Sequence, residues 1–142
     1  ALKKYYEDFK FKHPTPNDFK RVAEKVSGLH LDWYLNEWVE TNHTIDYAVA
    51  KVEEKNITLA RVGRIPMPID VTVTYMDGSI EDFNIPLRMM RGNKPTKATI
   101  LKDWPWAFPT YSFSVSKEVK SVEIDPANFM ADIVKSNNKF EK

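Results

Sequence analysis

The spacing of apolar residues changes once along this chain, and that change decides what it can fold into. Up to about residue 42 the apolar residues recur every three or four positions, as on one face of an α-helix. From His43 onward they alternate with polar residues, as in a β-strand with one buried face. We therefore expect an α+β chain in which a helical segment, residues 1–42, precedes a β-sandwich domain, residues 43–135.

Three short helices are expected in the helical segment, each with an apolar stripe. The stripe residues in chain order are Leu2, Tyr5, Tyr6 and Phe9, then Phe19, Val22, Ala23 and Val26, then Leu31, Tyr34, Leu35, Trp38 and Val39. The second helix has the clearest start, because Thr15 suits the N-cap, Pro16 the first helical position and Asp18 a capping box. Gly28 is placed to end that helix.

About seven short strands are expected after the helices, which is typical of an antiparallel Ig-like sandwich. The clearest strand is 69–75, in which Ile, Val, Val and Tyr alternate with Asp and Thr. Asp77-Gly78 follows it and predicts a type I′ hairpin turn with positive φ at both residues. The last residues, 136–142, are mostly polar, and we expect them to form a frayed tail.

Composition excludes several function classes. The chain has 21 Lys and Arg against 20 Asp and Glu, so its charge does not predict nucleic acid or an anionic membrane as a partner. It contains no cysteine, which excludes a disulfide scaffold, a thiol nucleophile and cysteine-ligated metal, and which suits either cytoplasm or periplasm. The chain also begins without methionine and with no residue able to cap its first helix, so we expect a processed chain or an excised piece.

No catalytic motif is present in the sequence. His13, His30 and His43 are separated by 17 and 13 residues, which matches no local zinc motif such as His-Glu-x-x-His, and we expect surface or capping histidines. The four glycines form neither a nucleophile elbow nor a phosphate-binding loop. We assign no catalytic residue, metal ligand or cofactor to this chain, and we expect it to be inactive on its own.

One aromatic loop stands out as a candidate ligand site. Trp104, Trp106 and Tyr111 lie close together in a segment that also holds Phe108 and is stiffened by two prolines, and they could form a platform for a sugar ring or an extended peptide. Alternatively, the loop folds its rings over the open end of the sandwich or against the helices, where each would bury about 150–250 Å².

Four aromatic residues of the helical segment are assigned to domain packing instead: Phe19, Trp33, Tyr34 and Trp38. Trp33 and Trp38 are expected to pack between the helices or onto the first strand. On that interpretation Trp38→Ala would cost about 3–5 kcal/mol, the usual range for truncating a buried large aromatic side chain.

The helical segment resembles the end of the catalytic domain in the aminopeptidase N family, the gluzincin zinc metallopeptidases. The resemblance is carried by the stretch from Tyr5 through His13-Pro14-Thr15-Pro16 to Phe19, and by the run Gly28, Leu31, Tyr34 and Trp38. In that family a β-sandwich domain follows. Residues 82–88 and 104–111 look like bacterial members in which the sandwich comes last.

The resemblance implies a carboxy-terminal fragment of a zinc aminopeptidase, a peptide hydrolase. The family's His-Glu-x-x-His, its additional zinc-ligand Glu and its Gly-x-Met-Glu-Asn motif do not occur here. The family's catalytic tyrosine lies upstream of the helix that residues 1–12 resemble, so Tyr5 and Tyr6 do not inherit its role. Zinc is therefore expected only in the parent enzyme.

The expected partner is the missing catalytic domain, with self-association of the exposed helical face as another possibility. The alternative is a free-standing sandwich module that binds carbohydrate or peptide.

Overall fold

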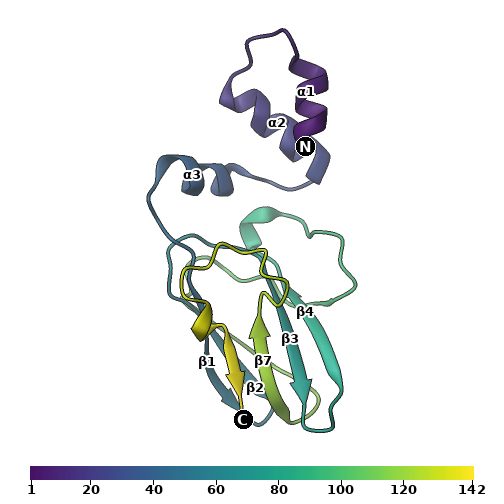
Figure 1. Cartoon of the computed structure of the whole chain (residues 1–142), viewed down its shortest axis with the longest axis vertical. Coiled ribbons are helices and arrows are strands. Elements are labelled where there is room, and N and C mark those ends of the chain that lie inside the picture. The colour runs from purple at the N-terminus through teal and green to yellow at the C-terminus, as the bar shows by residue number, and fades with distance from the viewer. The chain divides into compact units, whose positions relative to one another are not determined.

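The computed structural model describes all residues, 1–142, as an α+β chain with three helices and eight strands in two sheets. It divides into a helical unit, Ala1–Asn42 with Met89–Pro95, and a sandwich unit, His43–Arg88 with Thr96–Lys142 (Figure 1). None of the helices combines the length and the apolar character that a membrane crossing requires.

The three predicted helices are confirmed. They are α1 (Leu2–Phe9), α2 (Pro16–Ser27) and α3 (Asp32–Glu40). The capping box forms as expected, since the Thr15 backbone N–H donates to the Asp18 carboxylate at 2.8 Å. Gly28 ends α2 in the left-handed conformation with φ of 70°. These ends follow from local chemistry alone.

The sandwich unit holds two sheets. The strands are β1 (Tyr47–Glu53), β2 (Asn56–Arg61), β3 (Ile69–Tyr75), β4 (Ile80–Ile85), β5 (Thr99–Ile100), β6 (Thr110–Ser114), β7 (Val119–Ile124) and β8 (Lys139–Glu141). One sheet has the order β1-β2-β6 and the other the order β5-β4-β3-β7-β8. All pairs are antiparallel except the short parallel pair of β4 with β5. Two single turns of 3-10 helix, η1 (Arg88–Met90) and η2 (Lys135–Asn137), lie in the connections.

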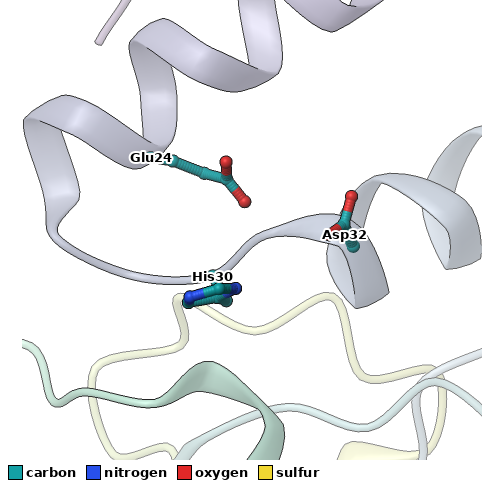
Figure 2. Close-up of side chains that lie close together, drawn as sticks. All are labelled: Glu24, His30 and Asp32. Carbon is teal, nitrogen blue, oxygen red and sulfur yellow. The ribbon is translucent and has the colours of Figure 1, made fainter.

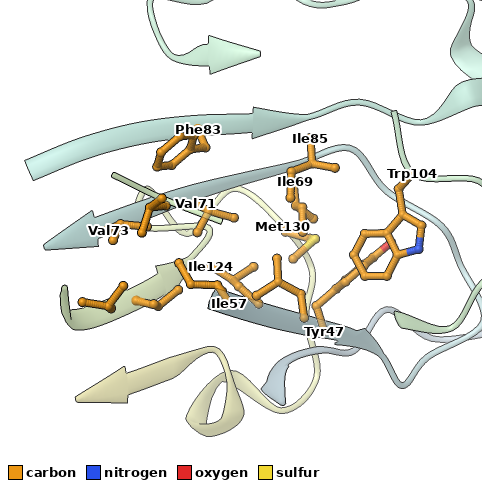
Figure 3. Close-up of a cluster of buried hydrophobic side chains, with 14 of the residues drawn as sticks. Tyr47, Ile57, Ile69, Val71, Val73, Phe83, Ile85, Trp104, Ile124 and Met130 are labelled. Atoms are coloured by element: carbon orange, nitrogen blue, oxygen red, sulfur yellow. The ribbon is translucent and has the colours of Figure 1, made fainter. Parts of the chain in front are cut away.

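Both sheets contribute side chains to one hydrophobic core (Figure 3). In β3 every second residue is buried, as its alternating sequence predicts. Ile57 and Leu59 of β2 are fully buried in the same cluster, as are Val71 and Val73 of β3. This shared core supports the expected sandwich, and the surface-facing polar residues of each strand agree with it.

The prediction of a frayed tail is wrong. Residues Lys139–Glu141 form β8, which pairs antiparallel with β7 through Glu123↔Lys139 and Ser121↔Glu141. Phe140 packs against the core, and Asn138 is buried beside it in sequence. A single apolar residue among polar ones carries no strand signal, but the open edge of β7 offers backbone groups that the tail can pair with.

The predicted type I′ turn after β3 is also wrong. Of Asp77 and Gly78, only Gly78 has a positive φ, at 83°, whereas a type I′ turn needs a positive φ at both residues. The Gly78 N–H donates to the Tyr75 carbonyl at 2.9 Å, and the Tyr75 N–H donates to the Ser79 carbonyl at 2.9 Å. The connection is thus a three-residue loop with glycine in the left-handed position, the other common hairpin geometry.

Candidate functional site

Trp104, predicted as part of an exposed platform, is a core residue of the sandwich unit. Its side chain is only 2% exposed and lies beside that of Tyr47 (Figure 3). The ring centroid of Trp104 is 5.6 Å from that of Tyr47 and 5.3 Å from that of Tyr111. The indole N–H donates to the Phe108 carbonyl at 2.8 Å. Burial removes a large apolar surface from water and leaves the one polar atom paired, so the platform assignment of Trp104 is wrong.

Tyr111, on β6, is half-buried beside Trp104. Its hydroxyl donates to the Lys102 carbonyl at 2.6 Å, and burial raises the pKa of the phenol. The ring lies 5.3 Å from that of Trp104 and 6.1 Å from that of Phe113, tilted against both. The residue therefore ties the loop to the sheet, and only part of its ring is available to a ligand.

Trp106 and Phe108 are the rings of this loop that face solvent, at 52% and 59% exposure. Arg61, at the end of β2, holds Trp106 in place. Its guanidinium donates to the Trp106 carbonyl at 2.7 Å, and the guanidinium carbon lies 5.7 Å from the ring centroid. Phe108 could have been included from the aromatic run, whereas no local pattern points to Arg61, which is 45 residues away.

In the helical unit the four residues assigned to packing contact other aromatic rings. Phe19 meets Tyr5 edge-on at 5.2 Å, and Tyr34 lies 5.6 Å from both Trp33 and Trp38. Trp38 is nevertheless 44% exposed, so its prediction as a buried residue is wrong for this chain. The short α3 turns part of its stripe outwards because nothing in the helical unit covers it.

The helical unit buries little of its own apolar surface. Only Val22, Ala23 and Met90 are buried within it. Its exposed large apolar residues, which we call the open helical face, are Leu2, Tyr6, Phe11, Val26, Trp38 and Val39. A hollow of about 300 Å³ between α2 and α3 is lined in part by Phe19, Leu35 and Val39. Large apolar side chains that are exposed thus outnumber the buried apolar side chains of this unit, six to three.

The turn from α2 to α3 brings together three side chains that can ligate a metal. One ligand atom each from Glu24, His30 and Asp32 lies within 4.8 Å of the others. Figure 2 shows Glu24 projecting from α2, Asp32 at the start of α3, and His30 on the loop that connects the two helices. Histidine spacing alone could not reveal this group, because its other two members are carboxylates and the Gly28 turn closes it.

The two carboxylates of this group each accept one hydrogen bond. Glu24 accepts the Leu31 backbone N–H through one oxygen at 2.9 Å. Asp32 accepts the Lys20 ammonium through one oxygen at 2.6 Å, and that hydrogen bond lowers the pKa of Asp32 below its ordinary value. Both carboxylates thus keep a second oxygen that carries no hydrogen bond to the protein.

The chain's residues do not fit the catalytic zinc site of the aminopeptidase N family. That site needs two histidines four residues apart with a glutamate after the first, and the chain has no such pair among its three histidines. His30 is the one histidine grouped with two carboxylates, and His13 and His43 take no part in that group. The family's zinc chemistry is therefore not available to these residues.

Comparisons with known proteins bring no assignment. No family model, no curated protein and no solved structure matches the chain.

Proposed function

We propose that this chain is the non-catalytic carboxy-terminal part of an aminopeptidase N-type zinc metallopeptidase, where it supports the catalytic domain and helps to shape the substrate entrance. The observation that carries the proposal is the open helical face, six large apolar side chains on a unit that buries only three apolar residues. The resemblance of residues 5–39 to the end of that family's catalytic domain says which partner the face would meet.

The lengths of the helices support the same view. The three helices have 8, 12 and 9 residues, and helices this short are marginal in water unless tertiary packing stabilises them. Full burial of one large apolar side chain contributes about 1.5–3 kcal/mol. Covering the open helical face with a neighbouring domain would supply the stability that the helical unit lacks by itself.

The order of units fits the proposal as well. Helices come first and a two-sheet unit follows, as in the family that residues 5–39 resemble. Within the proposal the sandwich unit is Ig-like, since its sheets share one core and its long strands pair antiparallel. The parallel pair of β4 with β5 departs from a purely antiparallel Ig-like arrangement.

In this proposal the chemistry belongs to the parent enzyme. Zinc there would polarise the scissile carbonyl and activate water with help from a glutamate base. No residue of this chain fits that site, so the chain contributes scaffold only. Aminopeptidase turnover by the purified chain with stoichiometric zinc would refute its non-catalytic role.

The first test is to read the coding DNA upstream of the Ala1 codon. We expect an open reading frame that continues for hundreds of codons and encodes His-Glu-x-x-His with a downstream glutamate. A start codon directly upstream would overturn the proposal and leave a free-standing module.

A second test measures the packing itself in the parent protein. Val39→Asp places a charge on the open helical face, where the side chain is 69% exposed in this chain. We expect the parent to lose thermal stability, while the isolated chain changes by less than about 0.5 kcal/mol, as surface substitutions do. Ile80→Asp is the matched control, since Ile80 is 66% exposed on the sandwich unit. Equal effects of the two substitutions in the parent would contradict the proposed contact.

A second candidate function is a free-standing module that binds carbohydrate or peptide. It is favoured by Trp106 and Phe108, which stay exposed on a loop anchored by Arg61. A sugar ring or proline stacked on Trp106 would change its fluorescence, and Trp106→Ala would abolish that change. A glycan and peptide panel that leaves the fluorescence unaltered would count against this function.

A further inference from the structure

The turn between α2 and α3 combines two carboxylates with an imidazole. Imidazole nitrogen suits zinc, copper, iron and nickel, whereas carboxylate oxygen alone would suit magnesium or calcium. Three protein ligands leave open positions on a tetrahedral ion, which water can fill. This donor set therefore favours a borderline transition metal over a hard cation.

We propose that Glu24, His30 and Asp32 form a surface site for one divalent transition-metal ion, with zinc the best match. The site is separate from the catalytic zinc of the proposed parent, and the inference does not rest on the proposed function. Its role would be to clamp the end of α2 to the start of α3 across the Gly28 turn.

The backbone that carries these ligands is held in place. The His30 N–H donates to the Met90 carbonyl at 2.9 Å, and the Trp33 indole N–H donates to the His30 carbonyl at 2.8 Å. The hydrogen bond from Leu31 to Glu24 orients that carboxylate towards the turn. Hydrogen bonds to a ligating carboxylate, such as the one that Glu24 accepts, orient metal ligands in known sites.

The distances need only a small adjustment. Zinc lies about 2.0–2.2 Å from nitrogen and oxygen ligands, so tetrahedral ligands are about 3.4 Å apart. Ligand atoms within 4.8 Å must close by about 1.4 Å, which side-chain rotations can supply because His30 and Asp32 are exposed. His30 and Asp32 also line a hollow of about 330 Å³ beside Trp33, Met89 and Arg91, which leaves room for water on the ion.

Lys20 competes with a metal ion for the Asp32 carboxylate. Its ammonium donates to Asp32 at 2.6 Å and neutralises part of the charge that a cation would meet. Replacing Lys20 with methionine keeps the length of the side chain and removes the charge. We therefore expect Lys20→Met to tighten zinc binding by about threefold or more.

The test is a calorimetric titration of the purified chain with zinc alone. We expect one saturable site per chain, at least tenfold weaker in His30→Ala and weaker in Glu24→Gln, which keeps the oxygen that accepts from Leu31. His13→Ala is the matched control, since it removes an exposed histidine outside the group and should bind zinc within twofold of the unmodified chain. Zinc should also raise the melting temperature of the unmodified chain and not that of His30→Ala.

Three results would overturn the inference. His30→Ala could bind zinc as tightly as the unmodified chain. His13→Ala could weaken binding as much as His30→Ala, which would indicate zinc on scattered surface histidines. Magnesium could displace zinc at equal concentration, which would show that the imidazole is not a ligand. Circular dichroism of His30→Ala establishes that the variant is folded, so each of these results bears on the site itself.

Discussion

Replacing Trp104 with alanine removes the largest side chain of the sandwich core. The indole is 2% exposed and contacts the rings of Tyr47 and Tyr111, so the substitution leaves a cavity between them. It also leaves the Phe108 carbonyl without the indole N–H that donates to it. Trp106, two residues along the same loop and 52% exposed, provides a matched comparison.

The expected loss follows from the area that leaves water. A buried aromatic side chain removes about 150–250 Å² from water, and at about 25 cal/mol per Å² this amounts to about 4–6 kcal/mol. Compaction of the unfolded chain makes that figure an upper bound. We expect Trp104→Ala to lower the free energy of unfolding by about 3–5 kcal/mol, as other core truncations of large aromatics do. Trp106→Ala should cost about 1 kcal/mol or less, mainly its contact with Arg61.

Urea unfolding followed by far-ultraviolet circular dichroism measures both losses without using tryptophan fluorescence, which the substitutions themselves change. The relevant transition is that of the sandwich unit, because the helical unit can unfold separately. A loss below about 1.5 kcal/mol for Trp104→Ala would refute its place in the core. So would a larger loss for Trp106→Ala than for Trp104→Ala.

Three further predictions concern the sandwich unit. Asp132→Ala leaves the backbone N–H groups of Tyr47 and Val134 without their carboxylate partner, so it should lower the free energy of unfolding in urea by about 2–4 kcal/mol. A loss no larger than that of Asp132→Asn would contradict this expectation. Gly63→Ala would place its Cβ 2.4 Å from the Thr44 carbonyl oxygen and should lower the free energy of unfolding by about 3 kcal/mol or more. A stability within about 1 kcal/mol of the unmodified chain in the same assay would show that the backbone can move. Burial raises the pKa of Tyr47 from 10.0 to about 12, so the folded chain keeps a proton that the unfolded chain loses, and the stability present below pH 10 is lost as the pH rises towards 12. Between pH 8 and pH 11 the stability gap between the unmodified chain and Tyr47→Phe should shrink by about 1.4 kcal/mol, and a constant gap would refute the shift.

Local chemistry made the helices predictable. The capping box of Thr15 and Asp18 and the left-handed Gly28 act within a few residues of the ends they define, so the sequence alone locates α2. The alternation in 69–75 is equally local and predicts β3 and its buried face. The group of Glu24, His30 and Asp32 could not be predicted, because these residues are unremarkable in the sequence until the turn brings the three together.

The tertiary structure decided which side chains are buried and which segments contact each other. Trp104 and Trp106 are the same residue type two positions apart, yet one lies against Tyr47, which is far away in the sequence, and the other faces solvent. Likewise β8 exists because β7 presents an open edge, and Trp38 is exposed because nothing in the helical unit covers it. The sequence by itself determined the elements whose hydrogen bonds close within one turn or whose apolar residues repeat at a regular spacing. Which face meets which neighbour depends on side chains distant in sequence, because hydrophobic burial is non-directional and is settled only when the sheets pack.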